Sequence, residues 1–399
     1  MKTFFILLGL FVLVAGRAEP ADVGQHWVGT WGTAPQLTEP RNLPPPPGLA
    51  SNTLRQVVHV SMGGEKMRVR FSNAFGNGPL AMAVVRVAVS AGGSAIKTET
   101  EKVLTFSGQP SATISVGETI LSDTLDFDLA PLSDVAVTIC FHETPGDVTG
   151  HPGSRTTSFL EAGDTVSAAE LPAAARTQHW YVLTGIDVQA EISAAAVVVL
   201  GDSITDGRGS ETDKNNRWPD DLANRLQTNA STRMVAVLNK GIGGNCVLRG
   251  GLGPTAAARF DRDVLGQESV RWLMVLEGVN DIGGSRGTNS TVTEDLISAY
   301  QKFIDRAHAK KIRILGATIL PFGGSQYAGT GHEAARQAVN DWIRTSGKFD
   351  AVVDFDAAVR DPQNPSKLLP AADSGDHLHP SVKGHQMMAD CTDLKLFEN

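Results

Sequence analysis

The feature that most constrains this chain is a series of five short apolar runs, separated by amphipathic stretches, in its second half. The runs span residues 194–200, 234–238, 270–276, 312–318 and 351–354. Parallel strands that are buried on both faces are continuously apolar, and the amphipathic stretches between them suit helices that cover the sheet. Residues 191–399 are therefore predicted to form an α/β domain with a doubly wound parallel sheet.

One of the amphipathic stretches follows Ser290. Thr291 and Glu294 have the spacing of a capping box, which would start a helix there. The apolar residues that follow recur at helical spacing and share one face: Leu296, Tyr300, Phe303, Ile304 and Ala307. That face is predicted to pack on the sheet.

The first half of the chain has a different pattern. Short segments of alternating or β-branched residues are separated by turn signals such as Gly63-Gly64, and they span residues 56–61, 66–72, 82–90, 133–142 and 180–188. This pattern is typical of antiparallel sheets that bury alternate side chains. Residues 19–190 are predicted to form a β-sandwich or jelly-roll domain. The proline-rich segment 40–47 is predicted to be an extended surface loop.

The N-terminus has the composition of a secretory signal. Lys2 precedes the apolar run from Phe4 to Ala15, which is followed by small residues and Arg17. The run is too short for the roughly 20 residues that span a bilayer. Residues 1–18 are therefore predicted to be a signal peptide. The mature protein is expected to be secreted or periplasmic, without stable membrane insertion.

Charge and cysteine content exclude some classes of function. The net charge of −8 and the dispersed Lys and Arg residues give no basic patch for a nucleic acid partner. The wide spacing of Cys140, Cys246 and Cys391 matches neither a zinc site nor a disulfide framework. One pair can close in an oxidising compartment, or all three can remain free thiols, and the sequence does not choose between these states.

Ligands of open parallel sheets bind beyond the carboxyl ends of the strands. The first predicted strand leads directly into Gly201-Asp202-Ser203, where a hydroxyl lies at a strand-to-helix turn. Ser203 is thus a candidate nucleophile, although a serine at such a turn can also serve only as a helix cap.

The loops after the next two predicted strands contain possible oxyanion donors. Gly244 can bring a backbone N–H close to a substrate, and Asn280 carries a side-chain amide that can donate a directed hydrogen bond. Taken alone, such glycines more often form a plain turn, and an Asn-Asp pair such as Asn280-Asp281 more often caps a helix.

Near the C-terminus, Asp376 and His379 stand three residues apart. A serine hydroxyl needs a base near neutral pH, and the base needs a partner that fixes its tautomer, so His379 and Asp376 suit these two roles. A metal site at Asp376, His377 and His379 is the alternative, but no further ligand cluster accompanies them. Neither a metal nor another cofactor is predicted, and His377 and His385 are expected to be structural.

Together these loops resemble the SGNH (GDSL-type) hydrolase superfamily. The matching blocks are Gly-Asp-Ser-Ile-Thr-Asp-Gly at 201–207, the glycine segment ending at Gly244, Gly-Val-Asn-Asp at 278–281 and Asp-x-x-His-Pro at 376–380. The resemblance covers residues 194–399 and implies a flavodoxin-like fold and ester hydrolysis. It also implies Ser203 as nucleophile, His379 as base and Asp376 as its acidic partner, with oxyanion donors from the N–H of Ser203, Gly244 and Asn280.

The first half also resembles known proteins. Residues 27–31 and 68–73 are similar to segments that precede the hydrolase domain in bacterial esterases like one from a rumen xylan-degrading gene cluster. This resemblance suggests a polysaccharide-associated acylhydrolase or arylesterase. The predicted function is therefore a serine esterase that removes short acyl groups, such as acetyl, from plant polysaccharide or related small-molecule esters.

Two other functions remain open. A lipid or aryl acylhydrolase would use the same triad. A non-catalytic glycan-binding protein could use Trp27, Trp31 and Trp180 for stacking, although such tryptophans more often pack in a core. The β-rich half could shape the substrate pocket, bind glycan, or only stabilise the hydrolase domain.

Overall fold

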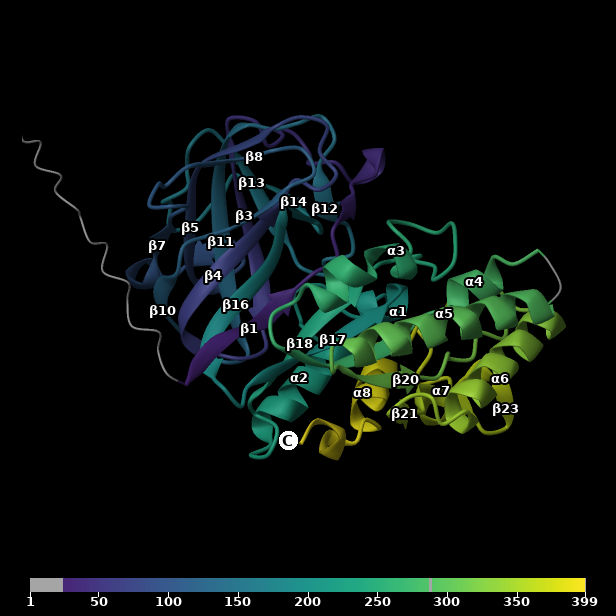
Figure 1. Ribbon diagram of the computed structural model, residues 1–399. Coiled ribbons are helices and arrows are strands. Elements are labelled where there is room, and N and C mark those ends of the chain that lie inside the picture. Colours follow the sequence, from purple (N-terminus) through teal and green to yellow (C-terminus); the bar gives the residue numbers. More distant parts are fainter. Residues whose placement is uncertain (1–23, 287–288, 399) are drawn as a thin grey trace, which may run out of the picture.

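The computed structural model describes residues 24–286 and 289–398, so the predicted signal peptide lies outside the described residues. Figure 1 shows a β-rich first half, drawn in purple to blue, beside an α/β second half in green to yellow. Within the described residues, no helix has both the length and the apolar character needed to span a membrane.

The second half is built on a five-stranded parallel sheet. All five predicted apolar runs form its strands, in the spatial order β18 (Val235–Gly241), β17 (Ala195–Gly201), β19 (Val270–Leu276), β20 (Arg313–Ala317) and β21 (Ala351–Val353). The first strand, β17, lies inside this sheet, and the later strands extend the sheet on both sides of it. The loops after β17, β18 and β19 therefore lie side by side at the carboxyl ends of the strands.

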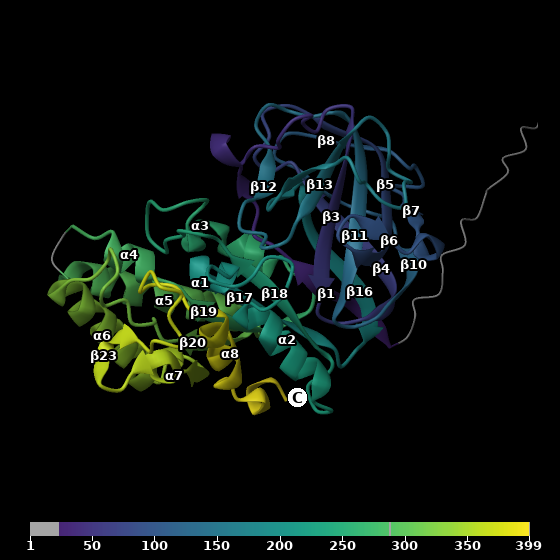
Figure 2. The same ribbon diagram turned by 180° about the vertical axis from the view of Figure 1, so that it is seen from behind.

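Helices cover both faces of the sheet. Helix α5 (Asn289–Ala309) lies in front of the strands in Figure 1, whereas α2 (Trp218–Thr228) and α8 (Val382–Asp390) lie in front in the opposite view of Figure 2. The predicted apolar face of α5 is buried. The predicted capping box is wrong, because α5 begins at Asn289 and places Thr291 inside the first turn.

The remaining helices of the second half connect these layers. They are α1 (Ser203–Asp206), α3 (Ala256–Phe260), α4 (Val279–Gly283), α6 (Thr330–Thr345) and α7 (Phe355–Val359), with a π-helical turn at Asp261–Leu265, a 3-10 turn at Leu394–Phe397, and a small hairpin of β22 (Arg360–Asp361) and β23 (Asn364–Leu368). Helix α6 packs beside α5, and α7 packs beside α8.

The first half consists of antiparallel sheets, compatible with the predicted β-sandwich. One sheet has the order β1 (Gln25–Gly32), β16 (Leu183–Glu191), β4 (Gly64–Ser72), β10 (Leu125–Leu129), with β9 (Thr119–Leu121) also on β4. The other has the order β14 (Ala175–Thr177), β13 (Ser158–Ala162), β3 (Asn52–Val60), β11 (Ser133–Glu143), β5 (Leu80–Gly92), β6 (Ala95–Ile96), with β7 (Lys102–Leu104) and β8 (Ala112–Ile114) on β5. A small third sheet joins β15 (Trp180–Tyr181), β12 (Thr149–His151) and β2 (Gln36–Leu37).

Two local expectations for the first half need correction. The predicted strand 180–188 is divided into β15 and β16, because Val182 has a φ of 56° that no regular strand accommodates. The proline segment is not extended throughout, since Pro40–Asn42 form a 3-10 turn in which Pro40 occupies the first helical position. The sequence left open whether two of the three cysteines form a disulfide. In the structure Cys140, Cys246 and Cys391 are all free thiols.

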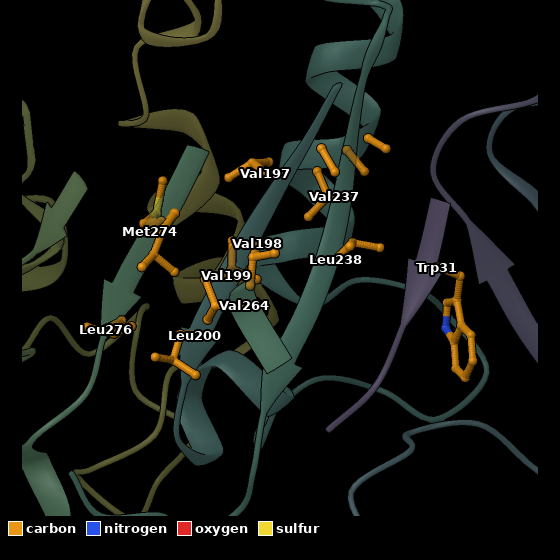
Figure 3. Packing of buried hydrophobic residues seen from close by; sticks show 14 of the residues in the cluster. Trp31, Val197, Val198, Val199, Leu200, Val237, Leu238, Val264, Met274 and Leu276 are labelled. Carbon is orange, nitrogen blue, oxygen red and sulfur yellow. The ribbon is translucent and has the colours of Figure 1, made fainter. Parts of the chain in front are cut away.

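The two halves share one continuous hydrophobic core. Strand β18 is the edge of the parallel sheet, and β1 of the first half packs beside it. The Ser61 hydroxyl accepts from the N–H of Val237 at 3.0 Å and donates to the carbonyl of Thr30 on β1 at 2.7 Å, so it links this edge of the sheet to the first half. Figure 3 shows Leu238 on the side of β18 that faces the strand carrying Trp31. The predicted boundary at residue 190 falls at the end of β16.

Candidate active site

Ser203 is the first residue of the short helix α1, directly after β17. The helix cap is Asp202, whose carboxylate accepts from the N–H of Ile204 at 2.9 Å, so the Ser203 hydroxyl is not used for capping. Gly209 lets the loop after α1 approach the C-terminal segment, because a Cβ at Gly209 would lie 2.0 Å from the carbonyl oxygen of Pro380. This close approach brings the loop of Ser203 beside His379.

The three residues of the predicted triad are joined by hydrogen bonds. The Oγ of Ser203 lies 2.8 Å from Nε2 of His379, and Nδ1 of His379 lies 2.7 Å from Oδ2 of Asp376. Because a carboxylate can only accept, Nδ1 carries the proton and Nε2 is left to accept the proton of Ser203. Ser203 and His379 are each less than a tenth exposed, while the Asp376 side chain is partly exposed.

Burial favours a neutral His379, and hydrogen bonds from His379 favour an ionised Asp376. Burial lowers the pKa of His379 from its ordinary 6.5, Asp376 opposes that change, and the charges of Arg208 and Arg155 lower the pKa further. Partial burial opposes ionisation of Asp376, but hydrogen bonds from the backbone N–H and ring of His379 outweigh it and lower the Asp376 pKa to about 2. A neutral imidazole beside a fixed carboxylate is the state that a general base requires.

The predicted oxyanion donors also lie at the carboxyl ends of the strands. Within the described part of the chain, the backbone N–H groups of Ser203 and Gly244 have no hydrogen-bond acceptor, so both are available to a ligand. The Asn280 amide is fixed at both ends: it donates to the carbonyl of Asn245 at 2.8 Å and accepts from the hydroxyl of Tyr327 at 3.0 Å. One N–H of Asn280 is left for a ligand.

These contacts identify two residues that the sequence did not single out as part of the site. Asn245 directly follows Gly244 in a block that had already been recognised, and Tyr327 lies in the loop after β20. Searching the loop after every predicted strand for polar side chains would have included Tyr327, but only the fold shows that its hydroxyl reaches Asn280.

A comparison of the chain with protein families agrees with this geometry. The model of the GDSL-like lipase/acylhydrolase family matches residues 199–387. The second half of the chain belongs to this family. The match covers the GDSL-like domain from the end of β17 into α8, and the β-rich half lies outside it. The protein thus carries an acylhydrolase domain.

Solved structures similar to the GDSL-like domain include three enzymes. A GDSL-like lipase from Bacteroides thetaiotaomicron is 20% identical, with 49% of this chain and 84% of that chain covered and a TM-score of 0.36. A catalytic mutant of an acetylxylan esterase from Geobacillus stearothermophilus is 21% identical, with coverage of 49% and 91% and a TM-score of 0.37. A carbohydrate acetylesterase from Sinorhizobium meliloti is 13% identical, with coverage of 49% and 94% and a TM-score of 0.38. The comparison with curated proteins gave no match.

A pocket of ≈ 510 Å³ opens beside Gly244 and Asn280 in the GDSL-like domain. Its wall combines charged side chains, including Arg249, Arg286 and Asp295, with apolar ones such as Leu248 and Val292. Asp281 also lines the pocket, but its two oxygens accept from the N–H groups of Val247 and Leu248. The pocket therefore places both charged and apolar groups next to two of the predicted oxyanion donors.

The histidines near the triad have other partners. His377 is exposed and its Nδ1 lies 2.5 Å from Asp373, away from Ser203. His385 is buried, accepts from the N–H of Trp218 at 3.3 Å and contacts the carbonyl of Arg208 at 3.1 Å. Both contacts are structural, as expected. Within the described residues, no three His, Cys, Asp or Glu side chains form a group that could hold a metal.

The β-rich half reaches the GDSL-like domain close to Ser203. His151 at the end of β12 lies 2.8 Å from Asp206 at the end of α1. Trp31 and Trp180 of the β-rich half are buried and pack edge to face with ring centroids 5.0 Å apart. These two tryptophans are therefore core residues and not surfaces on which a sugar could stack.

Proposed function

We propose that the protein hydrolyses esters through a Ser203–His379–Asp376 triad, with the N–H groups of Ser203 and Gly244 and the amide of Asn280 as oxyanion donors. The observation that carries the proposal is the continuous chain of hydrogen bonds from the Ser203 hydroxyl through His379 to Asp376. A serine ester hydrolase needs this arrangement of nucleophile, base and orienting carboxylate.

The reaction proceeds by two acyl transfers. The Oγ of Ser203 attacks the ester carbonyl carbon while Nε2 of His379 takes its proton, and the three donors stabilise the negative charge on the carbonyl oxygen. The C–O bond to the alcohol breaks, and the leaving oxygen takes the proton from His379. Water then attacks the acyl-enzyme with His379 again as base, releasing the acid and restoring Ser203.

For the substrate, we propose a short acyl group, such as acetyl, on a plant polysaccharide or a related polar ester. The charged side chains in the wall of the pocket beside Gly244 and Asn280 support a hydrated sugar more than a long lipid chain. A lipid or aryl ester is the alternative substrate. The burial of Trp31 and Trp180 argues against a purely glycan-binding role.

The apolar N-terminal run supports the further proposal that the protein is exported, to a secreted or periplasmic location, after loss of residues 1–18. The N-terminal sequence of the protein recovered outside the cytoplasm tests this. A mature chain that still begins at Met1 would contradict it.

The decisive test of the catalytic proposal is Ser203→Ala. We expect turnover of p-nitrophenyl acetate and acetylated xylan to fall by about 10⁴-fold or more, because the nucleophile is lost. Ser210→Ala, in the same loop, is the matched control and should keep normal turnover. Circular dichroism and the melting temperature check that both variants fold, and near-normal activity of folded Ser203→Ala protein would refute the assignment.

In the wild-type protein, faster turnover of acetyl than of octanoyl esters would support the proposed substrate class, and the reverse order would favour the lipid alternative.

A further inference from the structure

The β-rich half contacts the nucleophile helix through one buried polar pair. Nε2 of His151, on β12, lies 2.8 Å from Oδ1 of Asp206, the last residue of α1. His151 is 3% exposed and Asp206 is 2% exposed, so water does not screen the contact. The pair therefore joins the two halves of the chain three residues after Ser203.

The His151 ring is held from three sides. Its Nδ1 lies 2.9 Å from the carbonyl oxygen of Ala34, and its face stacks on Trp180 with ring centroids 5.8 Å apart. Since a carbonyl can only accept, the Nδ1 atom of His151 carries a proton. The contact between Nε2 and the carboxyl group of Asp206 contains a second proton, which the two groups share. Two of the three contacts that orient the ring, with Ala34 and Trp180, come from the β-rich half.

The other carboxylate oxygen of Asp206 leads to the predicted oxyanion loop. Oδ2 accepts from the N–H of Gly243 at 3.1 Å, and the next residue is Gly244. The β-rich half leaves just enough space for this oxygen, because a Cβ at Gly153 would lie 1.8 Å from it. Asp206 thus connects the helix of Ser203, the loop of Gly244 and a histidine of the β-rich half.

We propose that His151 and Asp206 are positioning residues, through which the β-rich half holds the Gly243–Gly244 loop so that the N–H of Gly244 faces the reacting carbonyl. This inference rests on the proposed function and assigns the β-rich half a role in it. An oxyanion donor stabilises the transition state only when its position is fixed before the charge develops. Neither His151 nor Asp206 touches the substrate in this arrangement.

The test compares three variants of the full chain. Asp206→Ala removes both contacts and should lower kcat by about 10²-fold, close to the loss of one oxyanion donor. Its KM should stay within about twofold, because ground-state binding is unchanged. Asp206→Asn should restore most of kcat, since the amide oxygen can accept from Gly243 and the amide N–H can donate to a neutral His151. His151→Phe keeps the packing on Trp180 but removes the support of Asp206, and its kcat should fall between those of the other two.

Glu268→Gln is the matched control. It breaks the ion pair between Glu268 and Arg68, in which the two side chains lie 2.7 Å apart across the same two halves. Glu268 precedes β19 at the amino end of the strands, opposite the catalytic loops, so its loss should leave kcat unchanged. A general loosening of the two halves would instead lower kcat in this variant as well.

Hydrogen exchange of residues 241–247, followed by mass spectrometry, supplies a readout that does not depend on ester turnover. Exchange should be faster in Asp206→Ala and His151→Phe than in the wild-type protein, and unchanged in Asp206→Asn and Glu268→Gln. If the wild-type protein cleaves no ester, the proposed function fails, while the exchange data still decide whether Asp206 holds this loop. Normal kcat and normal exchange in folded Asp206→Ala protein would overturn the inference, and so would a loss confined to KM or to the melting temperature.

Discussion

His379 illustrates how neighbouring residues adapt one side chain to a task. Burial, Arg208 and Arg155 favour the neutral imidazole, and Asp376 favours the imidazolium. Their sum lowers the pKa of His379 below 6.5, so the neutral base persists to lower pH than an ordinary histidine would. Arg155 comes from the β-rich half and Arg208 from the loop after α1, so both halves influence the base.

The pH profile should report this environment. We expect kcat/KM to fall as the pH drops through the pKa of His379, with an acid midpoint below 6.5, because the imidazolium cannot accept the proton of Ser203. Arg208→Gln removes a positive charge that disfavours the imidazolium, so the midpoint should move to higher pH. A midpoint that moves to lower pH in Arg208→Gln would contradict this account.

At the scale of secondary-structure elements, Arg259 joins the carboxyl ends of three strands. Its guanidinium donates to the carbonyl of Gly201 on β17 at 3.0 Å, to the carbonyl of Lys240 on β18 at 2.6 Å and to Glu277, directly after β19, at 3.3 Å. It also donates to Asn245, which in turn accepts from Asn280. Burial, followed by the nearby Asp202, raises the pKa of Glu277 well above its ordinary value. One buried side chain therefore fixes the carboxyl ends of these strands, and the loops that follow them, relative to one another.

Arg259→Leu should be strongly destabilising. The change leaves Asp263 and Glu277 buried without this cationic partner, and loss of one member of a buried ion pair costs about 3–5 kcal/mol in the free energy of unfolding. Urea unfolding followed by tryptophan fluorescence measures the loss. Arg306→Leu is the control, because its ion pair with Asp261 is largely exposed and should contribute at most about 1 kcal/mol. Similar unfolding midpoints for the two variants would contradict the role of Arg259.

At the scale of the whole molecule, the two halves form one folding unit. The hydrophobic core runs through both, and the Ser61 hydroxyl accepts from the N–H of Val237 at the edge of β18. Lys240 donates across the same interface to the carbonyl of Thr33 at 2.9 Å. Separating the halves would expose apolar side chains of β18 and leave a buried lysine without its acceptor.

A fragment of residues 191–399 should accordingly be insoluble or inactive when produced alone. Exposed apolar surface and an uncovered sheet edge both promote aggregation. The measurement is the soluble yield and p-nitrophenyl acetate turnover of the fragment, compared with the full chain. A soluble fragment with the kcat of the full chain would contradict both this expectation and the proposed role of the β-rich half.

The local pattern of the sequence was sufficient to predict the strands of the parallel sheet. Five apolar runs predicted its five strands, because a strand buried on both faces has to be continuously apolar. The helix after Ser290 was predicted for the same kind of reason, from one apolar face. Errors arose at Val182, whose backbone conformation divides a predicted strand, and at Thr291, which lies inside α5 and not at its cap.

The sequence by itself determined the candidate chemistry. Ser203, Gly244, Asn280, Asp376 and His379 each lie in a short block at the end of a predicted element, and the order of the blocks carries the resemblance to GDSL-type hydrolases. Only the tertiary structure decided what surrounds these residues. Tyr327, Arg259 and His151 act across long separations in sequence, and such contacts depend on how strands and sheets pack, which no local pattern encodes.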